Sequence, residues 1–238
     1  RLRRELGVIP PGDFRNCLVA LSDTEPLLAE LFQYRFNQGN GLKGHSFGNL
    51  FIAAMNDLTR SFPEALMQSS KILAVKGEII PATLQNVKLI AKLEDGSEIL
   101  GESFIGKTKS KITHLSIHPE NTKACPPALD KIKESDIIII GPGSLYTSII
   151  PNLSINDITK AINESKACKI YVCNIATQIG ETKGYSMEDH IQSLQKHTIP
   201  DIVDYVLANN NLRRLDERFF GEPVINKNKK LNNVQIIE

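Results

Sequence analysis

Residues 136–148 read Asp-Ile-Ile-Ile-Ile-Gly-Pro-Gly-Ser-Leu-Tyr-Thr-Ser, and this stretch decides the fold. Four successive isoleucines cannot alternate between a buried and an exposed face, so the run predicts a short strand covered on both faces, as in the centre of a parallel sheet. The glycines and proline of Gly141-Pro142-Gly143-Ser144 predict a sharp turn after it. Such a turn directs several backbone N–H groups to one spot, where a phosphate can bind. A tight strand exit without a ligand is the alternative, and the glycines alone leave both open.

Two more apolar runs follow the isoleucines and extend the same pattern. Residues 170–173 and 202–207 predict strands that are separated by helical segments, as in parallel βαβ units. Each run ends in polar, turn-forming residues. The carboxyl ends of parallel strands lie along one edge of a sheet, and ligands bind there in open α/β folds. We therefore expect three polar loops to converge on one cleft: 141–144, 174–182 and 209–211.

The first third of the chain is expected to be helical. Apolar residues recur at helical spacing in four segments, 14–21, 26–36, 45–55 and 61–73. Asp13 stands just before the first segment, where its carboxylate is well placed to cap the helix. The alternative is that Asp13, Arg15 and Asn16 face a ligand.

The third helical segment carries polar residues of its own. His45 and Asn49 are four residues apart and are expected on one helix face, either as buried structural groups or as ligand contacts. Gly48 lies early in this helix, where glycine costs stability relative to alanine. We therefore expect another backbone or a ligand to approach Gly48 closely.

The middle of the chain changes to the alternating pattern of β-strands. Alternation over 87–93, followed by Asp95-Gly96, predicts a hairpin, and 112–118 predicts another strand. Together they make a β-rich insertion, expected at 75–120. His114 and His118 fall on one face of the second strand, but no third metal ligand lies nearby in the sequence. A solvated sheet face is therefore the preferred interpretation.

Composition bounds the class of protein. At 238 residues the chain suits one large α/β domain. A net charge of +1 offers no global field for nucleic acid or membranes, and Arg1, Arg3 and Arg4 form the one strong basic cluster. No apolar segment approaches the roughly 20 residues that cross a bilayer. The four cysteines form no Cys-x-x-Cys pair, which favours a reducing, cytoplasmic setting.

Four motifs stand out along the chain. They are Pro10-Pro-Gly-Asp-x-Arg-Asn16, Gly44-His-x-x-Gly-Asn49, Gly141-Pro-Gly-Ser-Leu-Tyr-Thr-Ser148 with Pro151-Asn152, and Asn174-x-x-Thr-Gln-x-Gly-Glu-Thr182 with Asp189-His190. Taken in order, these motifs resemble those of the CofD-like family, and within it the YvcK-type gluconeogenesis factors. The resemblance implies one Rossmann-like three-layer α/β domain over residues 1–238, with a mostly parallel sheet, a helical N-terminal part and the inserted hairpin region. Family members open with a strand and a Gly-Gly-Gly-Thr-Gly loop that is absent here, so an N-terminal portion is expected to be missing.

The resemblance implies two alternative functions. The YvcK-like branch is implied to bind UDP-sugars such as UDP-N-acetylglucosamine, with NAD or GDP as other candidates, and to support cell shape and growth on gluconeogenic carbon sources. The other branch transfers a 2-phospho-L-lactyl group from a guanosine diphosphate-linked donor to a deazaflavin, using Mg²⁺. The motif details favour the regulatory role. We also expect a cytoplasmic homo-oligomer, in the form of a dimer. Neither nucleic acid nor a membrane is expected as a partner.

Charge arithmetic shapes the site hypothesis. A diphosphate carries two or more negative charges, a helix N-terminus supplies about half a positive charge, and no Lys or Arg lies within 141–148. Arg15, the Arg1 to Arg4 cluster, or a Mg²⁺ bound by Asp13 must supply the rest. Asp13 is also the candidate catalytic carboxylate. The residues hypothesised to line the nucleotide cleft are Asn16, His45, Asn49, Gly141, Gly143, Ser144, Thr147, Asn174, Thr177, Gln178 and Gly180.

Overall fold

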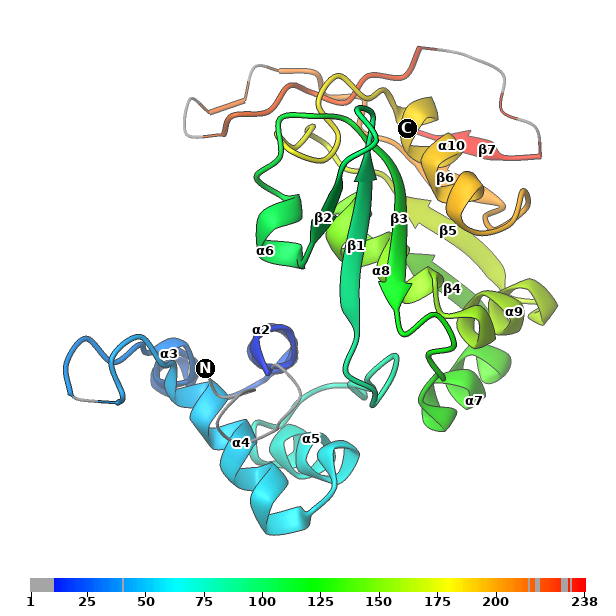
Figure 1. Ribbon diagram of the computed structural model, residues 1–238. Helices are drawn as coiled ribbons and strands as arrows, with labels where there is room; N and C mark the ends of the chain where they lie inside the picture. Colours follow the sequence, from blue (N-terminus) through cyan, green and yellow to red (C-terminus); the bar gives the residue numbers. More distant parts are fainter. Residues whose placement is uncertain (1–10, 40, 214, 217–218, 228–230, 232) are drawn as a thin grey trace. The chain divides into compact units, whose positions relative to one another are not determined.

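The chain folds into two compact units, residues 1–84 and 85–238. The computed structural model shown in Figure 1 describes residues 11–39, 41–213, 215–216, 219–227, 231 and 233–238. The basic cluster of Arg1, Arg3 and Arg4 lies outside them. Within the described residues, no helix has both the length and the apolar character that a membrane span requires.

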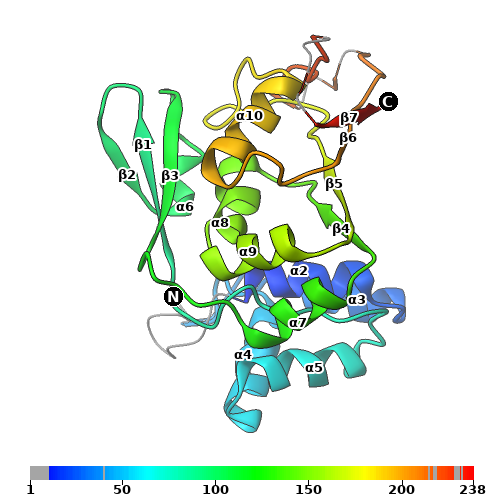
Figure 2. The same ribbon diagram turned by 90° about the vertical axis from the view of Figure 1, so that its right-hand side faces the viewer.

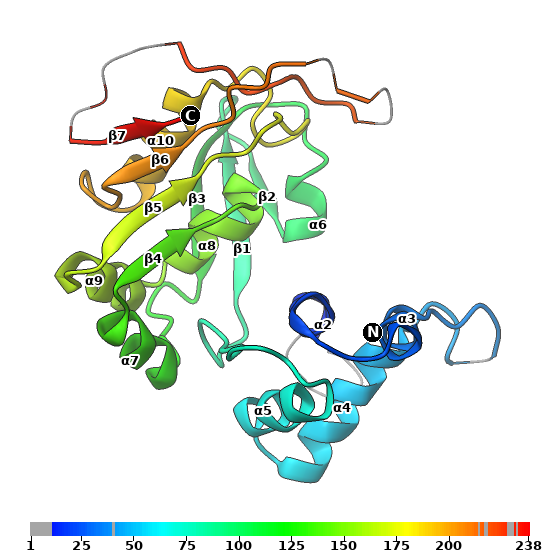
Figure 3. The same cartoon turned by 180° about the vertical axis from the view of Figure 1, so that it is seen from behind.

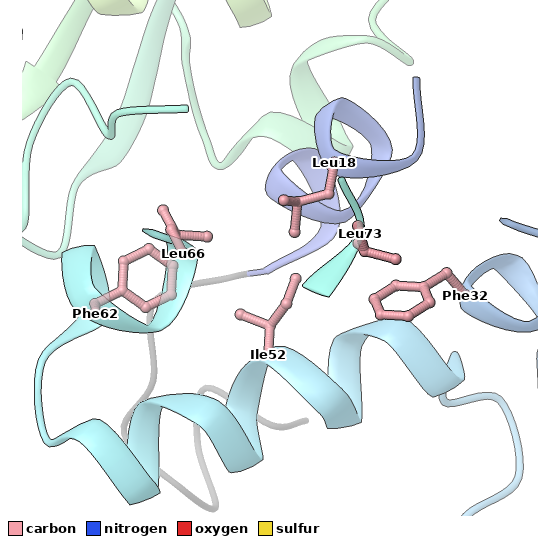
Figure 4. Packing of buried hydrophobic residues seen from close by; sticks show 6 residues of the cluster. All are labelled: Leu18, Phe32, Ile52, Phe62, Leu66 and Leu73. Atoms are coloured by element: carbon pink, nitrogen blue, oxygen red, sulfur yellow. The ribbon is translucent and has the colours of Figure 1, made fainter. Parts of the chain in front are cut away.

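The first unit is helical, as its sequence periodicity predicts. Buried apolar side chains from each of the four helices that the structure describes here meet in one core (Figure 4), which consists of Leu18, Phe32, Ile52, Phe62, Leu66 and Leu73. Burial of such side chains stabilises each helix against its neighbours, at about 1.5–3 kcal/mol for each large residue. The helices are α2 (Gly12–Leu21), α3 (Pro26–Gln33), α4 (Phe47–Thr59) and α5 (Phe62–Ile72).

Two predictions about helix starts are wrong. Helix α2 begins at Gly12 after Pro11, so Asp13 lies inside the first turn and makes no capping hydrogen bond there. Helix α4 begins at Phe47 because the Ser46 hydroxyl caps it, accepting a hydrogen bond from the Asn49 N–H at 3.3 Å. Serine is a strong N-cap residue. His45 therefore precedes the helix and does not share a helical face with Asn49.

The prediction of a close approach at Gly48 is confirmed. A Cβ atom built there would lie 2.7 Å from the Phe32 carbonyl oxygen and 2.8 Å from Cγ of Arg15. Since real Cβ atoms do not tolerate such distances, glycine lets helix α4 pack directly against the end of α3 and against the Arg15 stem.

The second unit opens with the predicted hairpin. Strand β1 (Lys88–Leu93) pairs antiparallel with β2 (Glu98–Leu100) and with β3 (Ile112–His118), in the order β2-β1-β3, and α6 (Glu102–Ile105) joins β2 to β3. Gly96 has a φ of +83° in the hairpin turn, a conformation that favours glycine. Among the described residues there is no group of three or more side chains that could hold a metal ion.

The predicted parallel strands form a second sheet. Its order follows the chain, β4-β5-β6-β7, and every neighbouring pair is parallel. The strands are β4 (Ile137–Ile140), β5 (Cys168–Val172), β6 (Tyr205–Leu207) and β7 (Gln235–Ile237). Helix α7 (Pro126–Glu134) precedes β4. The helices between the strands are α8 (Ile150–Leu153), α9 (Asn156–Glu164) and α10 (Met187–His197), and a one-turn π-helix (Leu145–Ile149) precedes α8.

The expectation that the isoleucine strand is central and covered on both faces is wrong for the described residues. Strand β4 lies at one edge of this sheet. Ile137 and Ile139 are 57% and 63% exposed, whereas Ile140 is 6% exposed. Figure 3 shows the sheet from the face on which no described helix of residues 85–238 lies. A run of four isoleucines makes both faces apolar, but the described residues of this unit place helices on one face alone.

The layers of the second unit are arranged so that helices lie between two sheets. Figure 2 shows α8 and α10 between the β2-β1-β3 sheet and the β4-β5-β6-β7 sheet. Helix α8 contacts β3, and the backbone N–H of Leu115 in β3 donates a hydrogen bond to Nε2 of His197 in α10. The α/β class and the parallel sheet are therefore confirmed, with a small antiparallel sheet as an outer layer.

Candidate functional site

Two of the polar loops that follow the parallel strands are joined by direct hydrogen bonds. Nδ2 of Asn174, just after β5, donates to the carbonyl oxygen of Gly143, just after β4, at 2.9 Å. Nε2 of Gln178 donates to Oγ of Ser144 at 2.9 Å. The predicted convergence of these two loops is confirmed, and it follows from the parallel order of β4 and β5.

The turn after β4 depends on one glycine in particular. Gly141 has a φ of +92°, and a Cβ atom there would lie 3.0 Å from the carbonyl oxygen of Val172 at the end of β5. Both the conformation and the space therefore favour glycine. At Gly143 an added Cβ would make ordinary contacts at 3.5 Å, so its close packing does not require glycine.

A buried carboxylate occupies the start of the π-helix that follows this turn. Oε2 of Glu181 accepts hydrogen bonds from the backbone N–H of Tyr146 at 2.9 Å and of Thr147 at 3.2 Å. Oε1 of Glu181 accepts a hydrogen bond from the Thr147 hydroxyl at 2.6 Å. The Glu181 residue is 7% exposed. Two amides and one hydroxyl of the predicted phosphate loop are thus bound to an anion of the protein itself.

The sequence hypothesis did not assign a role to Glu181. Glu181 lies in the motif Asn174 to Thr182. An acidic side chain beside a site for an anion is repelled by that anion, so sequence reasoning gave no reason to place Glu181 there. One feature of the sequence indicates this role for Glu181. No Lys or Arg lies within 141–148, so a carboxylate buried against this segment has to accept hydrogen bonds from its backbone N–H groups.

Two of the predicted ligand residues hold loops together. The backbone N–H of Thr177 donates to the carbonyl oxygen of Glu222 at 2.8 Å, and the Thr177 hydroxyl accepts from the Glu222 N–H at 3.0 Å. Gly180 has a φ of +92°, and a Cβ atom there would lie 2.4 Å from the carbonyl oxygen of Gly106. Thr177 and Gly180 therefore fix the 174–182 loop against its neighbours.

The groups left for a ligand at the joined loops are mainly acceptors. Oδ1 of Asn174 and Oε1 of Gln178 are buried and have no hydrogen-bond partner. The amide nitrogens of both side chains are anchored, so the orientation of these oxygens is fixed. The Ser144 hydroxyl accepts from Gln178 and retains its own proton for donation.

Two tyrosines, Tyr146 and Tyr185, connect these loops to helix α10 through hydrogen bonds. The Tyr146 hydroxyl lies 2.9 Å from the Tyr185 hydroxyl and 3.3 Å from Oγ of Ser193 in α10. Burial raises the pKa of Tyr146 well above its ordinary value. The side chain is therefore a neutral hydrogen-bonding group that fixes the π-helix to α10.

In the first unit, Arg15 organises the predicted residues. Its Nη1 donates to Oγ of Ser46 at 2.8 Å, and its Nη2 donates to Oδ1 of Asn16 at 2.7 Å. Burial lowers the pKa of Arg15, the charge of Arg35 lowers it further, and Asp13 raises it. Ser46 also accepts from the Asn49 N–H, so this serine, missed by sequence reasoning, connects Arg15 to Asn49.

The remaining predicted residues of this unit differ in their surroundings. Oδ1 of Asn49 is buried without a partner, whereas His45 is half-buried in the loop before α4. Asp13 is exposed on α2. A Mg²⁺ ion bound by one carboxylate and by substrate phosphates needs no cluster of acidic residues. The exposed Asp13 carboxylate is compatible with such a role, which stays a prediction.

Comparison with known families identifies the class. The family model described as "2-phospho-L-lactate transferase CofD" matches residues 1–234. The chain belongs to the CofD family.

Individual relatives are more specific. The chain is similar to a protein of Nostoc sp. named "Putative gluconeogenesis factor", with 58% identity over 82% of this chain and 42% of the relative. It is 47% identical to the "Gluconeogenesis factor" of Bacillus subtilis, over 88% of this chain and 66% of the relative. The chain thus spans 42% to 66% of the length of these two relatives.

A solved structure supports the fold. The crystal structure of a UPF0052 family protein from Bacillus halodurans superimposes with a TM-score of 0.93 at 43% identity. The match covers 100% of this chain and 78% of that chain.

Proposed function

We propose that this chain is the nucleotide-binding part of a regulatory gluconeogenesis factor and that it binds a nucleotide diphosphate sugar of the UDP-N-acetylglucosamine type. The observation that carries the proposal is the pair of hydrogen bonds from Asn174 and Gln178 to the Gly143-Ser144 turn. They hold the ends of β4 and β5 together, where ligands bind in parallel α/β sheets. The names of the relatives support the role in gluconeogenic growth, and normal cell shape belongs to the same proposal.

The chemistry of the loops fits a ligand with several donors. The buried oxygens of Asn174 and Gln178 accept from sugar hydroxyls or from a base N–H, and the Ser144 hydroxyl donates to a phosphate oxygen. Because Glu181 already uses the Tyr146 and Thr147 amides, the negative charge of a diphosphate has to be met elsewhere. The sequence-based prediction that Arg15 or a Mg²⁺ on Asp13 supplies this charge stays a prediction.

Calorimetric titration of the purified chain with UDP-N-acetylglucosamine, NAD and GDP tests the proposal. Ser144→Leu fills the turn beside Gln178 and is expected to abolish nucleotide binding. Ser148→Leu, at an exposed position four residues on, is the matched control and is expected to bind normally. Native affinity in Ser144→Leu, with an unchanged melting temperature, would remove the Gly141–Ser144 turn from the ligand site.

The same titration tests the predicted ligand residues of the first unit. Asn49→Ala removes a buried, unpartnered carboxamide, and Asn16→Ala removes the acceptor of Arg15 Nη2. Each is expected to weaken nucleotide binding. Normal affinity in both variants would exclude these residues from the ligand site.

The family model favours a second candidate function, 2-phospho-L-lactate transfer. Incubation with a guanosine diphosphate-linked phospholactate donor, a deazaflavin and Mg²⁺, followed by chromatography, tests it. Formation of the phospholactyl deazaflavin supports a transferase. An unconsumed donor in the presence of bound nucleotide supports the regulatory role.

The proposal includes a cytoplasmic location and assembly into a homodimer. The four cysteines are free thiols, which fits a reducing cytoplasm. A homodimer is proposed for the full-length protein, and light scattering after gel filtration measures its mass directly.

A further inference from the structure

A large cavity lies beside the loops of the second unit, and none of the residues that line it belongs to the Gly141–Ser144 turn. Its volume is about 630 Å³. The hairpin turn at Glu94-Asp95, the segment 108–111 that leads into β3, and the loop 179–185 line it. Figures 1 and 2 both show that the yellow loop before α10 lies beside the ends of β1 and β3.

The walls of this cavity are held by short contacts between the loops. Gly180 packs directly on the carbonyl of Gly106, as described above. The Glu94 N–H donates to the carbonyl oxygen of Lys111 at 2.9 Å, and the Ser110 N–H donates to the Thr108 hydroxyl at 3.2 Å. The cavity therefore needs little reorganisation to accept a ligand.

Three ammonium groups belong to the lining, from Lys109, Lys111 and Lys183. Among the described residues, neither Lys109 nor Lys183 has a hydrogen bond or an ion pair. The Lys111 ammonium lies 5.9 Å from the centroid of the Tyr185 ring. A second cavity of about 360 Å³ is also lined by Lys111 and Lys183.

The carboxylates of the lining are largely engaged by protein donors. Asp95 accepts from the Ser97 N–H at 2.9 Å and from the Ser97 hydroxyl at 2.6 Å. Glu181 accepts from Tyr146 and Thr147. Glu94 is the third carboxylate of this lining. The lining thus contains three lysines and three carboxylates, and its formal charges balance. Two of the carboxylates, Asp95 and Glu181, are held by protein donors, whereas no partner is described for the side chains of Lys109 and Lys183.

We propose that this cavity is a second ligand site, which binds a small multivalent anion of the phosphate or pyrophosphate type through Lys109, Lys111 and Lys183. Lysine ammonium groups bind phosphate oxygens as point charges and need no fixed fork geometry. The Ser110 hydroxyl is a further donor in the lining. A phosphorylated metabolite is the class of ligand that this chemistry fits.

The position of Glu181 gives the site a consequence for the neighbouring turn. Glu181 lines the cavity, and its carboxylate holds the amides of Tyr146 and Thr147. An anion beside the 179–185 loop acts on the residue that fixes the start of the π-helix. Occupation of the cavity is therefore expected to change nucleotide affinity at the Ser144 turn, whereas the anion site itself does not require that the proposed nucleotide function is correct.

The test is a calorimetric titration of the whole chain with inorganic pyrophosphate at low ionic strength. The triple variant Lys109→Gln, Lys111→Gln and Lys183→Gln is expected to bind at least about tenfold more weakly, since exposed charge pairs each contribute up to about a factor of five. The control removes three lysines from other parts of the unit: Lys133→Gln, Lys160→Gln and Lys166→Gln. It has the same net charge and is expected to keep its affinity within about twofold.

A second measurement locates the probe. Pyrophosphate is expected to shift the amide NMR signals of Gly180 and Ser110 in the native chain and in Ser144→Leu alike. The proposal is overturned if the native chain does not bind pyrophosphate, or if both triple variants lose affinity equally. It is also overturned if Ser144→Leu abolishes binding, because the probe then occupies the nucleotide turn.

Discussion

Nε2 of Gln178 donates a hydrogen bond to Oγ of Ser144 at 2.9 Å, although 34 residues separate them in the chain. The bond joins the loops that leave β4 and β5. The two residues should therefore be coupled energetically. In a double-mutant cycle of Ser144→Ala and Gln178→Ala, we expect a coupling of about 0.5–1.5 kcal/mol in the free energy of unfolding. Urea titration followed by circular dichroism measures it.

The control cycle pairs Gln178→Ala with Ser135→Ala. The Ser135 hydroxyl donates to the carbonyl of Lys131 in its own helix, so these two changes should add within about 0.5 kcal/mol. Additivity in the Ser144 cycle as well would contradict a direct bond between the loops.

Glu181 is expected to stabilise the π-helix through its three hydrogen bonds. Glu181→Gln keeps the size of the side chain but replaces one acceptor oxygen by a donor, and it removes the charge that strengthens these bonds. We expect a loss of about 1–3 kcal/mol in the free energy of unfolding. Glu164→Gln, an exposed change on α9, is expected to cost less than about 0.5 kcal/mol in the same urea titration. Similar losses in the two variants would mean that Glu181 is not a structural anion.

Gly180 and Gly184 separate the effect of backbone conformation from the effect of close packing. Both have positive φ, +92° and +74°, but an added Cβ would strike the Gly106 carbonyl from Gly180 and meet nothing within 4 Å from Gly184. Gly184→Ala is expected to cost about 1–2 kcal/mol from conformation alone. Gly180→Ala is expected to cost at least about 1 kcal/mol more, because the loops must move apart. Melting curves of the two variants measure the difference, and equal shifts would rule out the tight contact.

The sequence was sufficient to locate most of the elements. Alternation up to Leu93 and the Asp95-Gly96 turn predicted the hairpin, and the spacing of apolar runs predicted parallel strands at the positions of β4, β5 and β6. The meeting of Asn174 with Gly143 followed from that order. These features depend on local propensity and on the geometry that every parallel sheet shares.

The features that sequence reasoning missed depend on competition between neighbours in space. Ser46 caps α4, so the helix begins after His45, and Pro11 precedes α2 without any cap from Asp13. Glu181 takes amides that a phosphate was expected to bind, and its partners are 34 and 35 residues away. The pattern and spacing of residues do not indicate which of several possible acceptors binds a given donor in the folded chain.

The one-sided cover of the parallel sheet predicts unequal costs for neighbouring isoleucines. Ile140 is 6% exposed, so Ile140→Ala is expected to cost about 2–5 kcal/mol, the range for a large side chain removed from a core. Ile139 is 63% exposed, so Ile139→Ala is expected to cost less than about 1 kcal/mol. Urea titration of both variants is the measurement. Comparable losses would show that something covers the second face of β4 in solution.

His197 is expected to make the stability of the chain depend on pH. Its Nδ1 lies 2.6 Å from the Ser193 carbonyl oxygen and its Nε2 accepts from the Leu115 N–H at 3.0 Å, an arrangement that requires the neutral ring. Burial is the main cause that lowers the pKa of His197, and the nearby His114 and Lys196 lower it further. The pKa values of His114 and His190 are also lowered by burial.

The sign of the effect follows from proton linkage. Below about pH 6.5, the ordinary pKa of histidine, the unfolded chain binds protons that the folded chain does not. Stability is therefore complete above this pH and is lost as the pH falls through the lowered folded pKa. Urea titrations between pH 7.5 and pH 5 should show this loss. His197→Gln should reduce the loss, because the variant has no ring to protonate, whereas the exposed His118→Gln should leave it unchanged. An identical pH dependence in native chain and His197→Gln would mean that the bond from Leu115 does not hold β3 to α10.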